Sequence, residues 1–200
     1  MTGTADSAGR NSDAHAAQRA PPENAPNFFL LGGAKCGTTS LYHLLKQVED
    51  VYLPERKEPR FFAYRAAYAR GLAWYLDEYF SGAARRRWRG EATPQYLHGG
   101  RLVADRVRAS CGEDLRFVVL LRDPVARAWS HYRHARRLGI EPLSFREALA
   151  AEKDRLSENP EAWCGYFADG LYARALDDWF SVFPRDRFLV MLTDELERDP

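Results

Sequence analysis

Short apolar runs alternate along the chain with segments whose apolar residues recur every three or four positions. The runs at 28–31, 51–53, 115–121 and 187–192 have the length and composition of strands, and a further strand end is expected at 88–96, turning at Pro94. Helical spacing predicts helices at 38–48, 71–80, 101–110, 124–138 and 171–183, and another that starts at Phe145 behind Ser144. This alternation is typical of an α/β fold with a central parallel sheet flanked by helices.

The turn after the first run is rich in glycine and leads directly into a helix. Strand, glycine turn and helix start form an anion cradle, because their backbone N–H groups point at the ligand and the helix dipole favours negative charge. The fold class is therefore expected to be P-loop NTPase-like. The residues expected to hold a phosphate here are Lys35, Cys36, Gly37, Thr38, Thr39 and Ser40.

This loop departs from the nucleotide-kinase motif G-x-x-x-x-G-K-[ST], since Thr38 stands where the lysine belongs and Lys35 lies upstream. A γ-phosphate carries two charges and usually needs both a metal and a lysine. A sulfuryl group carries one charge, for which a single lysine with backbone donors suffices. A P-loop nucleotide kinase remains an alternative, with Asp123 as its candidate magnesium ligand.

Composition and charge narrow the class of protein. The 200 residues suit one domain, and a net charge of +1 gives no general attraction to nucleic acid or membrane. Three widely spaced cysteines predict reduced thiols and a cytoplasmic location. Residues 1–26 are poor in large apolar side chains and are expected to be a disordered tail before a domain spanning 27–200. Arginines at 85–89 and at 127, 133, 136 and 137 are interpreted as solvated faces that can also attract an anion.

Two further segments carry candidate chemistry. Glu58 lies among charges between two prolines, and Pro59 favours an extended backbone at Glu58. Such a carboxylate is either a solvated loop residue or a general base that Lys57 and Arg60 keep ionised. Later, the strand at 115–121 ends in Arg122, after which Asp123 and Pro124 are good N-cap and first-turn residues. Arg122 and Ser130 are expected to converge on one phosphate beyond the strand end.

Four segments together resemble the sulfotransferases that use 3′-phosphoadenosine 5′-phosphosulfate (PAPS), nearest to the carbohydrate and heparan-sulfate branch and its bacterial relatives. GGAKCGTTSL resembles the 5′-phosphosulfate loop, and KEPRFF resembles K-E-x-[HQ]-F-F, whose glutamate is the proposed base. GEATPQYL is similar to the substrate-loop motif E-K-[ST]-P-x-Y. RDPVARAWSHY is similar to the 3′-phosphate motif R-[DN]-P-x-x-R-x-x-S-x-[YF]. The resemblance covers 27–200.

The resemblance implies an enzyme that transfers a sulfuryl group from PAPS, without a metal, to a hydroxyl or amine of a carbohydrate or glycosylated small molecule. It makes Lys35 and Glu58 catalytic and assigns Lys57, Arg60, Thr93 and Tyr96 to the acceptor. Arg60 and Ala92 depart from the heparan-type motifs. The family pattern continues past residue 200 with a helical stretch and a basic loop. The chain is therefore expected to be a fragment, a truncated domain, or a nucleotide-binding remnant without turnover.

Overall fold

The computed structural model describes residues 20–160 and 162–198, and a single parallel sheet lies at its centre. Its five strands are ordered β2-β3-β1-β4-β5 and all neighbouring pairs are parallel, which confirms the predicted α/β class. The central strand is buried along its whole length, because helices cover both faces of the sheet. The strands are β1 (Phe28–Gly32), β2 (Val51–Tyr52), β3 (Trp88–Ala92), β4 (Arg116–Leu121) and β5 (Phe188–Leu192).

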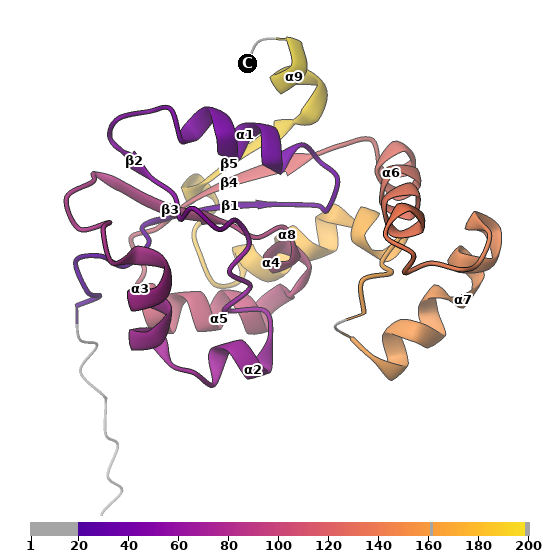
Figure 1. Cartoon of the computed structure of the whole chain (residues 1–200), viewed down its shortest axis with the longest axis horizontal. Coiled ribbons are helices and arrows are strands. Elements are labelled where there is room, and N and C mark those ends of the chain that lie inside the picture. Colours follow the sequence, from indigo (N-terminus) through magenta and orange to yellow (C-terminus); the bar gives the residue numbers. More distant parts are fainter. Residues whose placement is uncertain (1–19, 161, 199–200) are drawn as a thin grey trace, which may run out of the picture.

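Helices form a layer on each face of the sheet and a lobe beyond it. Helix α1 covers one face, the group α3, α4, α5 and α8 covers the other, and α6 with α7 stands beyond the carboxyl ends of β1 and β4 (Figure 1). The helices are α1 (Thr38–Leu45), α2 (Arg65–Tyr68), α3 (Leu72–Phe80), α4 (Gln95–His98), α5 (Gly100–Cys111), α6 (Pro124–Arg137), α7 (Phe145–Glu158), α8 (Tyr172–Phe180) and α9 (Thr193–Arg198), with 3₁₀ turns η1 (Ala168–Gly170) and η2 (Arg185–Arg187).

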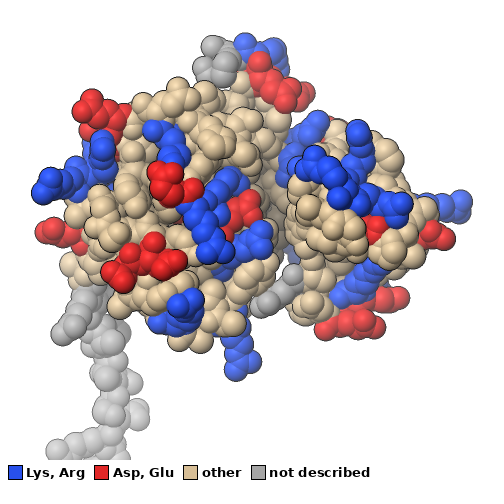
Figure 2. Space-filling model, viewed as in Figure 1, with Lys and Arg blue, Asp and Glu red and all other residues tan. Residues whose placement is uncertain are grey.

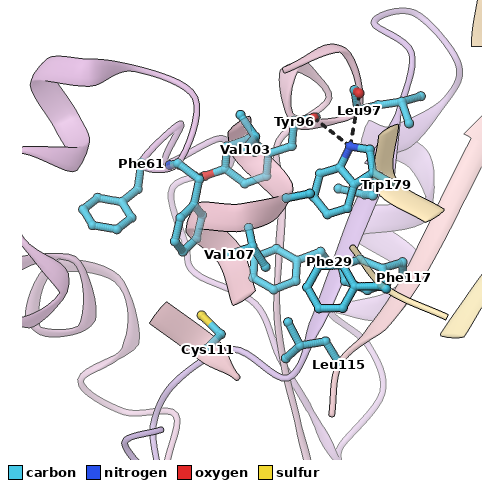
Figure 3. Close-up of a cluster of buried hydrophobic side chains, with 14 of the residues drawn as sticks. Phe29, Phe61, Tyr96, Leu97, Val103, Val107, Cys111, Leu115, Phe117 and Trp179 are labelled. Carbon is cyan, nitrogen blue, oxygen red and sulfur yellow. Dashed lines mark hydrogen bonds between the residues drawn. The ribbon is translucent and has the colours of Figure 1, made fainter. Parts of the chain in front are cut away.

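The larger apolar core lies under the face that carries α3, α5 and α8. Alternate residues of the central strands point into it, and the Phe117 ring packs 5.3 Å from the ring of Trp179 on α8. The indole N–H of Trp179 donates to the carbonyls of Tyr96 and Leu97, each at 3.2 Å, and so fixes α4 to α8 (Figure 3). This core holds the chain that follows β3 in place beneath the carboxyl edge of the sheet.

The start of the domain lies earlier than the sequence predicts. Residues 24–26 are packed against the domain: Ala25 is buried, and its carbonyl accepts a hydrogen bond from Arg89 Nε at 2.9 Å. Asn24 donates its amide to the Phe80 carbonyl at 3.3 Å. Short polar segments of this kind are ordered by backbone hydrogen bonds to the body, which composition does not reveal. Residues 1–19 lie outside the described residues.

Helix starts follow the predicted chemistry with one exception. Asp123 Oδ1 accepts from the Ala126 amide at 2.7 Å with Pro124 in the first turn, and Ser144 forms a capping box with Glu147. Thr193 is of a residue type that commonly caps helices, but at the start of α9 it instead donates its hydroxyl to the carbonyls of Cys36 and Leu121, each at 2.9 Å. It therefore ties the end of β5 to the glycine-rich loop.

Neither membrane spans nor disulfides are found among the described residues. Within 20–160 and 162–198, no helix combines the length and apolar content needed to cross a bilayer. All three cysteines of the chain are buried and free, as the sequence predicts.

Glu91 on β3 has an unusual environment for a carboxyl group. The side chain is fully buried near the hydroxyls of Tyr75 and Tyr96. Neither oxygen makes a hydrogen bond of normal geometry with a described residue. Burial raises the pKa of Glu91 to about 8, against a smaller lowering by the two hydroxyls. The group is therefore protonated at neutral pH.

Replacing Glu91 by glutamine should flatten part of the dependence of stability on pH. Between the ordinary pKa of 4.5 and about 8 the unfolded chain has released this proton while the folded chain retains it, so stability falls as pH rises through that window. We expect Glu91→Gln to melt higher than the parent at pH 8 and at nearly the same temperature near pH 4.5. Thermal melts across this range measure it. Glu113→Gln, at an exposed site, controls for the loss of a carboxylate. If the melting temperatures of Glu91→Gln and the parent change with pH in parallel, the raised pKa of Glu91 is contradicted.

Candidate active site

A cavity of about 680 Å³ opens at the carboxyl ends of β1 and β4, between the sheet and the α6–α7 lobe. Ligands of open α/β sheets bind at this edge. Figure 2 shows basic side chains on both sides of the hollow that separates the lobe from the body. The cavity brings together predicted residues from separate segments: Lys35, Gly37, Thr38, Thr39, Glu58, Arg60, Arg122 and Ser130.

The glycine-rich loop presents fewer free amides than the sequence suggests. The Cys36 amide donates to the Gly33 carbonyl at 3.1 Å, and the Ser40 amide donates to the Gly37 carbonyl at 3.0 Å. No described residue accepts from the amides of Gly37, Thr38 or Thr39. Gly37 has a φ of +85°, a left-handed conformation that suits glycine at a helix start. The amides of 37–39 are therefore the ones left available to meet a ligand.

Cys36 supports the loop from behind. Its side chain is fully buried, with Sγ 3.6 Å from the hydroxyl of Tyr172 on α8. Burial raises the pKa of the thiol, so it stays protonated. The predicted contact between Cys36 and the anion is consequently not made by its side chain, and its amide is already bonded within the loop.

Lys35 carries the positive charge of the loop at the centre of a cationic cluster. Its backbone has a φ of +74°, and the Arg122 guanidinium donates to its carbonyl at 3.4 Å. Burial, together with the charges of Arg137 and Arg122, lowers the pKa of the Lys35 ammonium. Like charges held this close favour the binding of an anion between them.

Helix α6 lines a neighbouring cavity of about 430 Å³ with further cations. Ser130, Arg133, His134 and Arg137 follow one face of the helix and meet Lys35 and Arg122 there. The convergence of Arg122 and Ser130 was predicted, and Arg133 and Arg137 belong to the cluster that was expected to be able to attract an anion. The contribution of His134 was missed. Arg133, His134 and Arg137 lie three, four and seven residues after Ser130, and this helical spacing is the signal that places them on its face.

Arg127 was expected on a solvated face and is instead fully buried. Its guanidinium donates to the carbonyls of Ala34, Gly165 and Tyr166 and lies 3.9 Å from an oxygen of Asp169. A buried cation requires this number of partners. The residue matches the internal arginine of the 3′-phosphate motif, but the contacts make it a clamp on the loop. Its neighbour His131 is also buried, with a pKa that burial and Arg127 lower to about 3.

Glu58 reaches the cavity from the opposite wall. One carboxylate oxygen accepts from Lys57 Nζ at 2.8 Å and the other from Arg60 Nη2 at 2.9 Å. Burial alone would raise the pKa of Glu58, but the two cations outweigh it and hold the pKa below its usual range. The side chain is 26% exposed and lines the cavity, so the carboxylate is ionised and accessible.

The backbone around Glu58 differs from the prediction. Its φ is +61° and that of Arg60 is +57°, so the segment is not extended before Pro59. This left-handed curvature brings both cations onto the same carboxylate, and their ion pairs offset a conformation that is unfavourable for non-glycine residues. Lys57 and Arg60, predicted to bind the acceptor, are engaged first with Glu58.

Thr93 and Tyr96, also predicted to contact the acceptor, lie beneath the cavity. Both are fully buried. Thr93 Oγ1 accepts from the Arg60 amide at 3.4 Å, and the Tyr96 hydroxyl accepts from the Phe62 amide at 3.2 Å. They position the segment that carries Glu58, and the intervening Pro94 and Gln95 line the cavity instead. The segment that resembles the substrate-loop motif thus contacts the cavity through Pro94 and Gln95, and not through Thr93 and Tyr96.

Asp123, the candidate metal ligand of the kinase alternative, is occupied as the N-cap of α6. Among the described residues there is no cluster of three or more His, Cys, Asp or Glu side chains with metal-binding proximity. These features do not favour the kinase alternative.

Comparisons with known proteins agree with the geometry. A family model described as a sulfotransferase domain matches residues 25–200. A sulfotransferase structure from Alicyclobacillus acidocaldarius is 37% identical with a TM-score of 0.79, over 88% of this chain and 76% of that one. Heparan sulfate glucosamine 3-O-sulfotransferase 6 of Mus musculus is 35% identical over 88% of this chain. The human bifunctional heparan sulfate N-deacetylase/N-sulfotransferase 3 is 28% identical over 89% of it.

The chain spans 48% of the mouse relative and 21% of the human one. The extent of the family match and the close structural relative together settle the family. The chain belongs to the sulfotransferase family.

Proposed function

We propose that this chain transfers the sulfuryl group of PAPS to a hydroxyl of a carbohydrate acceptor. One observation carries the proposal: Lys35, the 37–39 amides, the Arg122–Ser130 pair and Glu58 all open into one cavity, although four separate segments supply them. Two relatives, a 3-O-sulfotransferase and an N-sulfotransferase of heparan sulfate by name, support a sugar acceptor. They also leave transfer to an amine as the second possibility.

The two phosphates of the donor are held by two different groups of residues. Arg122 and Ser130 hold the 3′-phosphate, while the amides of Gly37, Thr38 and Thr39 hold the 5′-phosphate. Lys35 stands between them and neutralises charge on the sulfuryl group and on the phosphate that leaves. Because these are fixed donors, little reorganisation is required when charge moves from one group to the other.

The transfer step balances with Glu58 as the base. The acceptor oxygen forms a bond to sulfur while the bond from sulfur to the 5′-phosphate oxygen breaks, and Glu58 takes the proton from the acceptor hydroxyl. Adenosine 3′,5′-bisphosphate leaves with the bonding electron pair. The ion pairs with Lys57 and Arg60 weaken Glu58 as a base, so they must loosen when the acceptor hydroxyl arrives at its carboxylate.

Donor recognition should be visible in nucleotide binding without a metal. We expect adenosine 3′,5′-bisphosphate to bind at least about tenfold more tightly than AMP in the presence of EDTA, because Arg122 adds a charge-assisted contact to the 3′-phosphate. Arg122→Ala should remove most of that difference, whereas Arg101→Ala, at an exposed site on α5, should leave it unchanged. Calorimetry measures both. Equal affinity of the parent for the two nucleotides would refute the 3′-phosphate assignment.

Glu58→Gln should abolish transfer while preserving the fold. Glutamine keeps the shape of the side chain and removes the proton acceptor, and a general base commonly contributes about 100- to 10,000-fold in rate. A radiolabelled transfer assay with an acceptor found by screening, beside adenosine 3′,5′-bisphosphate binding and a thermal melt, separates chemistry from stability. If turnover persists and only the melting temperature falls, Glu58 is a structural residue.

The pH profile of transfer should be bounded by the two catalytic groups. The rate rises as Glu58 loses its proton, and since its pKa lies below 4.5, the acid limb should fall below that value. The rate drops as Lys35 loses its proton. Because the pKa of Lys35 lies below 10.5, the alkaline limb should begin at a lower pH than for an ordinary lysine. Measurement of kcat/KM against pH tests both limbs. An acid limb near pH 6 to 7 would point to a histidine as the base.

A further inference from the structure

A second cavity of about 400 Å³ continues from the candidate active site, and the proposed reaction steps do not use it. Its volume is within the range of about 300 to 1,000 Å³ typical of small-ligand pockets. Five residues line both cavities and form the junction between them: Ala34, Tyr64, Pro94, Gln95 and Trp163. Because Glu58 and these junction residues line the same first cavity, a molecule whose hydroxyl meets Glu58 has room for its remaining part in the second cavity.

Residues lining the second cavity carry polar atoms that lack partners. Gln95 Oε1, His98 Nε2 and Trp163 Nε1 are buried, and none has a hydrogen-bond partner among the described residues. Buried polar atoms are normally paired, so three in one wall point to a ligand that supplies the missing bonds after small side-chain rotations. Burial lowers the pKa of His98, which therefore stays neutral, and a proton on Nδ1, facing Asp169, leaves Nε2 as an acceptor. The wall thus offers two acceptors and one donor.

The junction is aromatic and fixed in place. Trp163 packs with its ring centroid 4.7 Å from that of His131 and 5.2 Å from that of His134, so α6 holds the indole. Tyr64 lies on the same junction. Aromatic rings beside hydrogen-bonding groups suit a ligand with apolar faces and a polar rim. A sugar ring has C–H faces and a rim of hydroxyls.

The charges of the second cavity select among sugars. The carboxylates of Asp169 and Asp178 line it together with the exposed cation Arg174. Asp169 lies 3.9 Å from the buried Arg127 guanidinium, so Asp178 is the carboxylate whose charge the ligand meets. The Asp178 carboxylate lies beside Gly100, where an added Cβ would be 2.7 Å from Oδ2. Carboxylates accept hydrogen bonds from hydroxyl and ammonium groups and repel sulfates and uronates.

We propose that the second cavity is an acceptor subsite for a non-anionic sugar, neutral or amino, and that its carboxylates discriminate against uronate- or sulfate-bearing sugars. The inference rests on the proposed function, because it places the acceptor relative to Glu58. On this inference the acceptor of this chain differs from heparan sulfate, the polyanion named in the descriptions of two relatives.

Three matched probes test the subsite: the p-nitrophenyl β-glycosides of glucose, glucosamine and glucuronic acid. Each is titrated into the full chain, with and without adenosine 3′,5′-bisphosphate, and followed by ligand-observed NMR. The glucoside and glucosaminide should bind at least about tenfold more tightly than the glucuronide. Asp178→Asn keeps the side-chain shape and should narrow that gap severalfold. Asp186→Asn, at an exposed position in η2, should not.

The outcomes separate this inference from the proposed function. Equal or tighter binding of the glucuronide, or an unchanged gap in a folded Asp178→Asn variant, overturns the subsite. If adenosine 3′,5′-bisphosphate binds but no glycoside does, the subsite fails while the donor site stands. If the glycosides discriminate as expected but the nucleotide does not bind, the donor assignment fails and the subsite stands. If Asp178→Asn does not fold, Trp163→Phe is the second variant, because it removes only the N–H donor and part of the ring. It should weaken binding of the glucoside severalfold, and unchanged binding overturns the inference.

Discussion

The buried guanidinium of Arg127 holds together the segments from which the candidate active site is built. It donates to a carbonyl of the glycine-rich loop and to the carbonyls of Gly165 and Tyr166, and it lies beside Asp169. A charge with no access to water is stable only if nearly all of its hydrogen bonds are made. The loop, α6 and the 165–169 segment therefore keep one arrangement relative to each other. This constraint fixes the positions of Lys35 on the loop, Ser130 on α6 and Asp169 in the lining of the second cavity.

Within this frame the electrostatics of the two walls differ. Around the loop, Lys35, Arg122 and Arg137 repel one another, which lowers the pKa of Lys35 and favours an incoming anion. On the opposite wall Glu58 is neutralised by two cations at about hydrogen-bonding distance. These two ion pairs thus keep the carboxylate charged and lower its basicity. In the proposed mechanism an acceptor hydroxyl replaces at least one of these ion pairs, so acceptor binding and activation of the base are coupled.

The features that the sequence predicts well are those determined by neighbouring residues. A run of apolar residues followed by glycines and a helix start gives β1, its loop and α1, and Asp123 with Pro124 gives the start of α6. The same reasoning fails where distant contacts decide. The left-handed φ of Glu58 depends on its ion pairs and on Thr93, which is 35 residues later in the chain. Tyr96 matched a substrate-loop motif, but only the packing of the core shows that its hydroxyl accepts from the Phe62 amide.

Two departures from the heparan-type motifs acquire a physical meaning in the fold. Arg60, in place of histidine or glutamine, gives Glu58 a second cation and so lowers its basicity. Ala92, in place of lysine, is buried on β3 beside β1, so no cation is supplied to the acceptor side at that position. The proposed acceptor subsite instead carries Asp178, and Asp169 beside Arg127, while the proposed donor side keeps its arginines and lysine. A polyanionic donor and a polyanionic acceptor compete for the same cations in a site this small. Confining positive charge to the donor wall removes that competition, and it favours an acceptor that is recognised by hydrogen bonds and ring faces.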